Sequence, residues 1–282
     1  MNRKIGLLAL IIVITLVIIS MYIFSLNNKS DFVNEDDYDF KIHFFNAGKA
    51  DACIISNSGK HIMIDTGEEN LKDEILSYFK NNNITKIDYL IITHFDKDHV
   101  GSASYVINAI QVENVLESNV PKESTYYENY KEALLNKNIT ADVVSGNRTF
   151  SVGSIEMTVN GPNKIYDSNE SNNSSLITKI KYGDTSYLFM GDSQNDRIKD
   201  YLEETNGTVN LIKMPYHGNY QKKLYSLLEK VQPKYAVITS SEEEIEDEDV
   251  ITLLKDMNID YYLTREGKVD VYSNGDVIII EQ

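Results

Sequence analysis

The chain has 282 residues and a net charge of −16, from 43 acidic and 27 basic residues. Its 42% apolar and 25% charged residues are the usual balance for a folded domain. An acidic surface repels phosphate backbones, so general nucleic-acid binding without a bridging metal ion is disfavoured. The single cysteine, Cys53, excludes an internal disulfide, and its apolar neighbours predict a small core residue.

The N-terminal segment differs in composition from the rest of the chain. Arg3 and Lys4 precede residues 5–26, which carry no charge. At about 1.5 Å per residue, a helix over this segment spans roughly 33 Å, enough to cross a hydrocarbon core of about 30 Å. A cleavable signal peptide would have a shorter apolar stretch and a small-residue cleavage site, and none is evident.

This pattern predicts an uncleaved, single-pass anchor at residues 1–26, in contact with the cytoplasmic membrane through residues 5–26. Because the basic residues stay on the cytoplasmic side, the rest of the chain is expected outside the cytoplasm. Residues 27–39 read as a polar tether. Residues 40–282 remain for the folded domain, a length that suits one α/β domain better than two small ones.

The spacing of apolar residues predicts the elements in chain order. The first three strands are separated by turn signals, which favours an antiparallel meander. Two strand-rich halves, each with helices, predict a sheet sandwich that is covered by helices on its outer faces. Strands are predicted at 41–45, 52–55, 62–64, 89–92, 155–159, 176–182, 187–190, 209–213, 235–239, 261–263, 269–272 and 277–280, and helices at 71–79, 195–202, 224–231 and 250–257.

The strongest chemical signal is the segment THFDKDHVG, which directly follows a continuous apolar strand. In an extended chain, residues two apart face the same side, so His94, Asp96 and Asp98 are expected to converge. His99 then turns inward at the start of the next helix. Imidazole and carboxylate groups together suit zinc, manganese or iron, so this segment predicts a metal site.

Other polar residues have an ordinary structural interpretation beside a functional one. Asp65 can cap a turn, Asp192 can be a helix N-cap, and His217 can be a loop histidine. His43 and His61 lie in strand patterns without clustered partners, and we expect both to be structural. The acidic run at 242–249 precedes a helix, so it is expected to complement the helix dipole and otherwise to face water.

Taken together, the motifs resemble the metallo-β-lactamase superfamily, and specifically its ComEC-type branch. In that branch His-x-Asp-x-Asp-His replaces the more common His-x-His-x-Asp-His. The resemblance covers residues 41–282 and implies an αββα sandwich. It is carried by FNAGKADA at 45–52, IDTG at 64–67, HFDKDH at 94–99, FMGD at 189–192 and PYHG at 215–218.

The resemblance also implies a site for one to two divalent ions, zinc or manganese. In it, Asp65 orients the metal-binding loop, and Asp98 also orients the hydroxide that the two ions share. The implied ligands are His94 and Asp96 for one ion, Asp98, His99 and His217 for the other, and Asp192 as the bridge.

Two departures from the family pattern affect the first ion. The usual middle histidine ligand is absent, and residues 172–176 read NNSSL in that region. The first ion therefore has fewer nitrogen ligands, which favours weaker occupancy or manganese. Tyr216 stands where the branch usually has histidine, and its phenol can donate a hydrogen bond to substrate.

These features favour a phosphodiesterase that uses a metal-bound hydroxide. The family includes nuclease-like domains of DNA-uptake proteins and phosphocholine esterases of bacterial surface polymers, so DNA or a surface polymer is the expected substrate. Tyrosines 126, 127 and 130 can line a choline pocket, although their spacing is more typical of helix packing. The alternatives are a β-lactamase or other amide or ester hydrolase, which Asp96 disfavours, and a non-catalytic binding domain, which the six retained ligands disfavour. The sequence identifies no protein partner.

Overall fold

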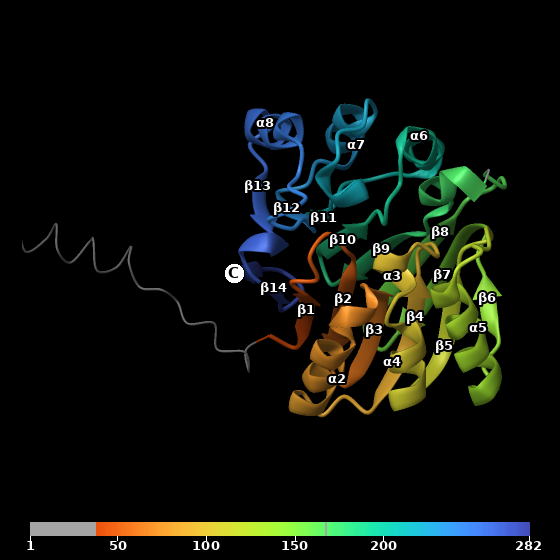
Figure 1. The fold of residues 1–282 in the computed structure, drawn as a ribbon. Helices are drawn as coiled ribbons and strands as arrows, with labels where there is room; N and C mark the ends of the chain where they lie inside the picture. The colour runs from red at the N-terminus through yellow and green to blue at the C-terminus, as the bar shows by residue number, and fades with distance from the viewer. Residues whose placement is uncertain (1–37, 167) are drawn as a thin grey trace, which may run out of the picture. The chain divides into compact units, whose positions relative to one another are not determined.

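The computed structural model describes residues 38–166 and 168–282 (Figure 1). The expected membrane anchor and most of the expected tether, residues 1–37, lie outside these described residues. No helix within the described ranges is long and apolar enough to cross a membrane. Tyr38–Gln282 form one compact unit.

The first sheet has eight strands in the order β15-β14-β1-β2-β3-β4-β5-β6. Strands β1, β2 and β3 pair antiparallel, as the predicted meander requires, and β3 to β6 pair parallel. Helices α2, α4 and α5 cover its outer face (Figure 1). The bounds are β1 Phe40–Phe44, β2 Ala52–Asn57, β3 Lys60–Thr66, β4 Lys86–Ile92, β5 Gln111–Glu117, β6 Ala141–Val143, β14 Val269–Ser273, β15 Ile278–Glu281, α2 Lys72–Asn81, α4 Ala103–Ala109 and α5 Thr125–Lys137.

The second sheet has seven strands in the order β13-β12-β11-β10-β9-β8-β7. Its strands β10 to β13 are parallel and β7 to β10 are antiparallel. Helices α6, α7 and α8 cover its outer face. The bounds are β7 Gly146–Val152, β8 Ile155–Gly161, β9 Ile177–Tyr182, β10 Thr185–Phe189, β11 Leu211–Lys213, β12 Tyr235–Ile238, β13 Asp260–Leu263, α6 Asn195–Glu204, α7 Leu224–Val231 and α8 Glu248–Asp256.

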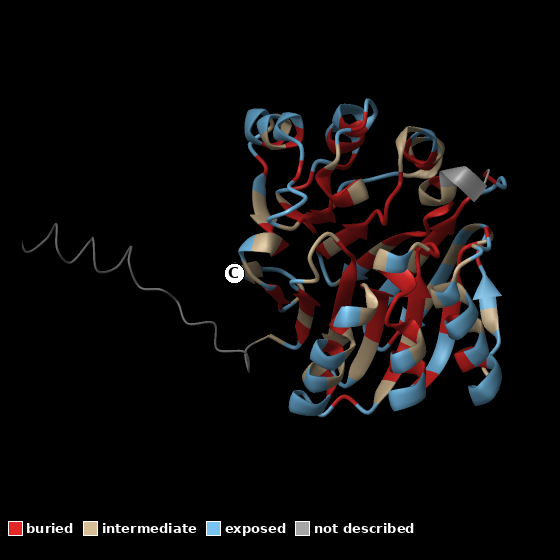
Figure 2. Cartoon of the chain, viewed as in Figure 1, coloured by how far each residue is buried: buried red, intermediate tan, exposed pale blue. Residues whose placement is uncertain are grey.

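Three apolar layers hold the described residues together, and Figure 2 shows them as buried strands between exposed helix faces. The central layer lies between the sheets and includes Phe44, Ile64 and Phe189. The other two layers lie between each sheet and its helices. This arrangement of helix, sheet, sheet and helix confirms the predicted sandwich. Cys53 lies in the central layer, as its apolar neighbours predicted.

The region between residues 103 and 152 contains elements that the sequence did not predict. β6 has only three residues, and β7 exposes most of its alternating polar side chains at the edge of its sheet. α5 carries a narrow apolar stripe in which Tyr130 and Leu134 are buried. Short or polar elements of this kind leave a weak periodic signal, because few of their side chains reach the core.

The polar segments of interest follow strand ends. Asp65 is near the end of β3, and the THFDKDHVG segment follows β4. Asp192 follows β10, and His217 lies in the short 3₁₀ helix η4 (Pro215–Gly218) after β11. Parallel strands end at the same edge of a sheet, so the two sheets bring these segments to one region.

Candidate metal centre

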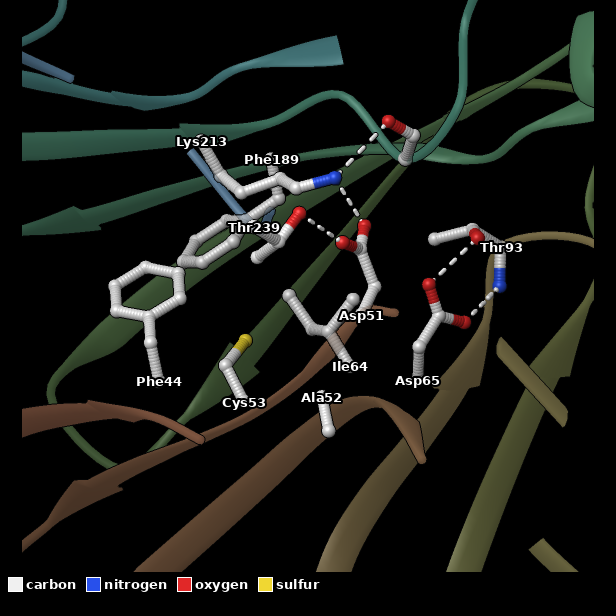
Figure 3. A pocket seen from close by; sticks show the side chains of 11 residues that line it. Phe44, Asp51, Ala52, Cys53, Ile64, Asp65, Thr93, Phe189, Lys213 and Thr239 are labelled. Atoms are coloured by element: carbon white, nitrogen blue, oxygen red, sulfur yellow. Dashed lines mark hydrogen bonds and ion pairs between the residues drawn. The ribbon is translucent and has the colours of Figure 1, made fainter. Parts of the chain in front are cut away.

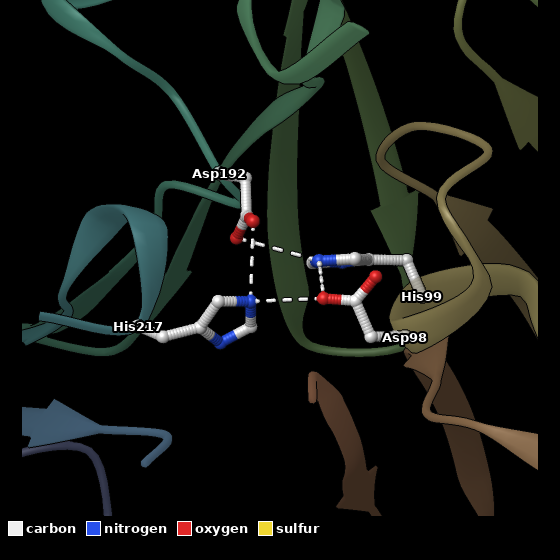
Figure 4. Close-up of side chains that lie close together, drawn as sticks. All are labelled: Asp98, His99, Asp192 and His217. Carbon is white, nitrogen blue, oxygen red and sulfur yellow. Dashed lines mark ion pairs between the residues drawn. The ribbon is translucent and has the colours of Figure 1, made fainter. Parts of the chain in front are cut away.

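Four side chains converge where the two sheets meet (Figure 4). One ligand atom each from Asp98, His99, Asp192 and His217 lies within 4.8 Å of the others. Asp192 is central to the group, because its Oδ1 is 3.3 Å from His99 Nε2 and its Oδ2 is 3.1 Å from His217 Nε2. Asp98 Oδ2 is 3.2 Å from His217 Nε2 and 3.6 Å from His99 Nε2.

Several buried polar atoms in this region make no hydrogen bond. Buried polar atoms are normally satisfied, and leaving them without a partner costs free energy. In the described part of the chain, the atoms of this kind at the centre are His94 Nε2, His99 Nε2, His217 Nε2 and Asp192 Oδ1. Three imidazole nitrogens and a carboxylate oxygen are a donor set that suits a divalent transition metal. The residues present therefore fit the metal that the sequence motifs implied.

The backbone of the HFDKDH motif differs from the extended segment that the sequence predicted. The chain is extended only as far as Asp96, which is the N-cap of the one-turn helix α3 (Lys97–Val100). Asp98 and His99 therefore face the cluster from a helical turn, whereas strict extended alternation was expected to bring in Asp96 as well. Because the chain turns at Lys97, Asp96 lies outside the group of four converging ligands.

Asp96 and His94 form the edge of the centre. The Asp96 Oδ1 atom is 3.9 Å from His94 Nε2, and the His94 ring lies 4.1 Å from the His99 ring. The same Oδ1 atom contacts Lys122 Nζ and accepts a hydrogen bond from Ser171 Oγ at 2.8 Å. His94 therefore lies beside the group of four ligands without belonging to it, and Asp96 is engaged by other side chains.

Asp65 holds the THFDKDHVG loop through contacts with Thr93 and His99. Its Oδ2 lies 2.8 Å from His99 Nδ1 and accepts a hydrogen bond from Thr93 Oγ1 at 2.7 Å, while its Oδ1 accepts from the Thr93 backbone N at 2.8 Å. The side chain is fully buried, and its backbone has a left-handed φ of 55°. These contacts support the expected role of Asp65 in orienting the loop, since they fix the His99 ring.

A second supporting network was not predicted from the sequence (Figure 3). The buried carboxylate of Asp51 contacts Lys213 Nζ and accepts a hydrogen bond from Thr239 Oγ1 at 2.6 Å. Thr239 Oγ1 lies 3.0 Å from His217 Nδ1, so the network holds the His217 ring on the side away from the cluster. Asp51, Lys213 and Thr239 line a cavity of about 10 Å³ between the sheets. Asp51 belongs to the FNAGKADA motif, which was the feature of the sequence that could have identified it as a site residue.

The segment that stands in place of the missing histidine is held by a buried arginine. Arg197 donates from Nε to Ser175 O at 2.9 Å and from a guanidinium nitrogen to Asn160 O at 2.7 Å. Ser175 Oγ accepts from the Asp192 backbone N at 3.0 Å and lies 3.5 Å from His94 Nδ1. Asp192 is not the N-cap of α6, because Gln194 takes that position.

The acids and imidazoles of the cluster shift one another's pKa values. Burial lowers the pKa of His217, but Asp192 and Asp51 raise it further, to about 10. For His99, burial likewise opposes the carboxylates of Asp192 and Asp65, and the pKa lies well above its ordinary value. Burial raises the pKa of Asp98, but His99 and His217 lower it to about 2. In the metal-free protein the cluster therefore favours charged imidazoles beside charged carboxylates.

The remaining candidate residues lie in structural settings. His43 Nδ1 is 2.6 Å from Asp270 Oδ1 in a buried pair, and His61 Nδ1 is 2.9 Å from Ser56 Oγ on the neighbouring strand. Tyr130 is buried in α5 and donates to Glu117 at 2.9 Å, which supports the helix-packing interpretation of the tyrosines.

The turn that carries His217 and the acidic run at 242–249 each have a feature that the sequence did not predict. Tyr216 and His217 both have left-handed φ angles, of 51° and 52°, which turn the chain sharply after β11. The acidic run does place Glu248 and Asp249 in the first turn of α8, as the dipole argument expected. Glu246, however, does not face water: it is buried and accepts a hydrogen bond from Arg265 at 3.2 Å.

Comparison with known proteins points to one superfamily. The family model described as the metallo-beta-lactamase superfamily matches residues 46–240. "Recombination protein 2" of Haemophilus influenzae is 25% identical over 71% of this chain and 24% of its own length. "ComE operon protein 3" of Bacillus subtilis is 22% identical over 59% of this chain and 21% of its own length. The chain thus spans about a quarter of the length of these curated relatives.

Solved structures share the fold at low sequence identity. The metallo-beta-lactamase fold protein YhfI from Bacillus subtilis has a TM-score of 0.58 and 9% identity, covering 86% of this chain and 99% of its own. CmlA, a diiron beta-hydroxylase from Streptomyces venezuelae, has a TM-score of 0.54 and 16% identity, covering 83% of this chain and 54% of its own. With the family model and the curated relatives, the chain belongs to the metallo-beta-lactamase superfamily, in its ComEC-type branch.

Proposed function

We propose that the chain is a membrane-anchored, metal-dependent phosphodiesterase that acts outside the cytoplasm. The observation that carries the enzymatic part is the convergence of Asp98, His99, Asp192 and His217, of which the last three have a buried ligand atom without a hydrogen-bond partner. Asp98, His99, Asp192 and His217 would hold a divalent ion, zinc or manganese. A bound ion of this kind would activate water and withdraw charge from a phosphoryl oxygen.

The chain's own residues hold and orient this site. Asp65 and Thr239 fix the Nδ1 sides of His99 and His217, so the Nε2 atoms point toward the shared carboxylate of Asp192. Asp98 is 22% exposed at its side chain, whereas His99 and His217 are buried. Asp98 is therefore the cluster carboxylate best placed to contact both the interior and an incoming water molecule, which is the catalytic role proposed for it.

The choice of a phosphodiester rests on the acidic residue at position 96 and on the relatives. Lactam hydrolysis in this superfamily is associated with the His-x-His pattern, and Asp96 stands at the second histidine. One curated relative is named a recombination protein, which connects it with DNA, a phosphodiester polymer. DNA or a phosphodiester-containing surface polymer is thus the proposed substrate class. The N-terminal apolar segment supports the proposed location.

A substrate panel tests this function directly. The full chain, loaded with zinc or with manganese, is assayed on bis-(p-nitrophenyl) phosphate, DNA, a phosphocholine ester and a chromogenic cephalosporin. We expect phosphodiester cleavage with negligible cephalosporin turnover. His99→Ala should lose metal and activity together, and Asp192→Asn should lower kcat by about 100-fold or more, because it removes a charged group shared by the cluster.

Two results would contradict the proposal. Efficient β-lactam hydrolysis without phosphodiester cleavage would assign the site to amide chemistry. Full metal loading without turnover of any substrate would favour a binding domain that retains the fold.

A further inference from the structure

A lysine lies at the edge of the metal centre and contacts Asp96, the carboxylate of the HFDKDH motif that lies outside the group of four ligands. The side chain of Lys122 contacts Asp96 through its ammonium group. Its partner atom, Asp96 Oδ1, also accepts a hydrogen bond from Ser171 Oγ at 2.8 Å and is the carboxylate atom 3.9 Å from His94 Nε2. Oδ1 is thus the Asp96 oxygen that lies near His94.

The lysine is held in place by neighbouring segments. Lys122 lies between β5 and α5, where Ser118 Oγ donates to Ser174 O at 2.7 Å and Ser124 caps α5 by accepting from Tyr127 N at 3.2 Å. Lys122 Nζ also lies 3.5 Å from Ser171 Oγ. The loop that carries Lys122 is therefore bonded to the segment that carries Ser171, and both converge on Asp96.

This arrangement leaves a poor set of ligands for a second ion. Each carboxylate oxygen has two lone pairs, and Lys122 and Ser171 use those of Asp96 Oδ1. The family's third nitrogen ligand is absent, and Ser175 offers only a neutral hydroxyl near His94. A second dication would also be repelled by the ammonium group. The residues fit one ion well and a second ion badly.

We propose that Lys122 takes the place of a second metal ion in this chain. One divalent ion, held by Asp98, His99, Asp192 and His217, completes the centre, and Lys122 supplies the second positive charge. Its side chain is 35% exposed, so an ammonium hydrogen remains available for a non-bridging oxygen of a substrate phosphate. This contact with substrate rests on the proposed phosphodiesterase function, whereas the single-ion stoichiometry does not.

Metal content tests the stoichiometry without any assay of activity. The full chain is dialysed against a micromolar concentration of free zinc or manganese, and bound metal is measured by elemental analysis. We expect one ion per chain in the natural sequence and in Lys122→Arg. We expect two in Lys122→Met, because Asp96 Oδ1 then becomes available beside His94.

Lys97→Met is the matched control. The substitution removes the same charge from the chain as Lys122→Met does. Lys97 lies next to Asp96 in the sequence, but its ammonium group pairs with Glu68 at 2.9 Å. Its metal content should remain one ion per chain. Two equally tight ions in the natural sequence, or a single ion in Lys122→Met, would overturn the proposal.

Kinetics test the contact with substrate separately. With one ion bound, Lys122→Met should cleave bis-(p-nitrophenyl) phosphate about 100-fold more slowly, as for the loss of one charge-stabilising donor. Excess manganese should restore much of kcat in Lys122→Met and leave the natural chain unchanged. A Lys122→Met protein with unaltered kcat and KM would refute the contact. If no variant cleaves a phosphodiester while the metal contents follow the pattern above, the proposed function fails and the single-ion centre stands.

Discussion

Asp65 is not one of the four converging ligands, but its contact with Nδ1 orients the ring of His99, which is one of them. Both oxygens of Asp65 accept hydrogen bonds within the motif: Oδ1 from the Thr93 backbone N, and Oδ2 from Thr93 Oγ1 and His99 Nδ1. Asparagine at this position has only one acceptor oxygen, and its amide NH₂ group would face Thr93 or His99 Nδ1, which are themselves donors. The change removes an orienting contact while keeping the size of the side chain.

We therefore expect Asp65→Asn to weaken zinc affinity by about 10- to 100-fold, the usual effect of losing a partner that orients a metal ligand. Competition with a chromophoric chelator measures the affinity. Asp88→Asn is the control, because Asp88 lies on the adjacent strand β4 and pairs with Lys60 at 2.9 Å, away from the cluster. Equal affinities for the two variants would show that Asp65 does not orient the ligand.

The pKa values of the cluster make metal binding depend on pH. The pKa of His217 is raised from 6.5 to about 10, so the metal-free protein holds that proton at neutral pH. The proton stabilises the metal-free fold fully below pH 6.5, and this contribution is lost as the pH rises through about 10. His99 shifts in the same direction. An ion binds the neutral imidazoles, so it must displace these protons.

Zinc binding at pH 7 should therefore release one to two protons per chain, and the affinity should fall as the pH is lowered. Calorimetry in buffers with different ionisation enthalpies counts the protons. His217→Gln should release fewer protons than the natural chain. Binding without proton release at pH 7 would be inconsistent with protonated imidazoles in the metal-free cluster.

At the scale of elements, α6 fixes the segment that replaces the family's middle histidine. Arg197 on α6 is almost fully buried and donates to Ser175 and Asn160. Burial lowers the pKa of this guanidinium to about 10, but the group remains charged at neutral pH. Without it, the backbone acceptors it contacts would stay buried and unsatisfied.

Arg197→Met should lower the free energy of unfolding by roughly 3 kcal/mol, since unsatisfied buried acceptors cost about 1–3 kcal/mol each. Urea denaturation of the metal-free protein measures the change. Arg148→Met is the control: its side chain is 40% exposed, and its ion pair with Asp142 should be worth less than about 1 kcal/mol. Equal losses for the two variants would contradict the role given to Arg197.

The site was predictable to the extent that it is local in the sequence. Asp98 and His99 are neighbours within one motif, and the resemblance supplied Asp192 and His217. Lys122 and Ser171 reach Asp96 across sequence separations of 26 and 75 residues, and a contact of that kind leaves no local pattern. The two-sheet sandwich followed from strongly apolar strands, whereas β6 and β7 were missed because they bury few side chains.

At the scale of the whole molecule, the N-terminal composition predicts a defined topology. Arg3 and Lys4 precede the apolar residues 5–26, so the N-terminus is expected in the cytoplasm and the hydrolase domain outside it. Protease added to intact spheroplasts should remove the domain, and a cytoplasmic marker protein should survive as the control. Survival of the domain alongside that marker would reverse the orientation.

The centre draws its ligands from both halves of the sandwich. Asp98 and His99 follow β4 of the eight-stranded sheet, while Asp192 and His217 follow β10 and β11 of the seven-stranded sheet. A bound ion thus joins the two halves, and at 100 times its dissociation constant it adds about 2.7 kcal/mol to folding stability. Because proteases cleave unfolded chains, the concentration of the ion would then govern how long the domain survives in their presence.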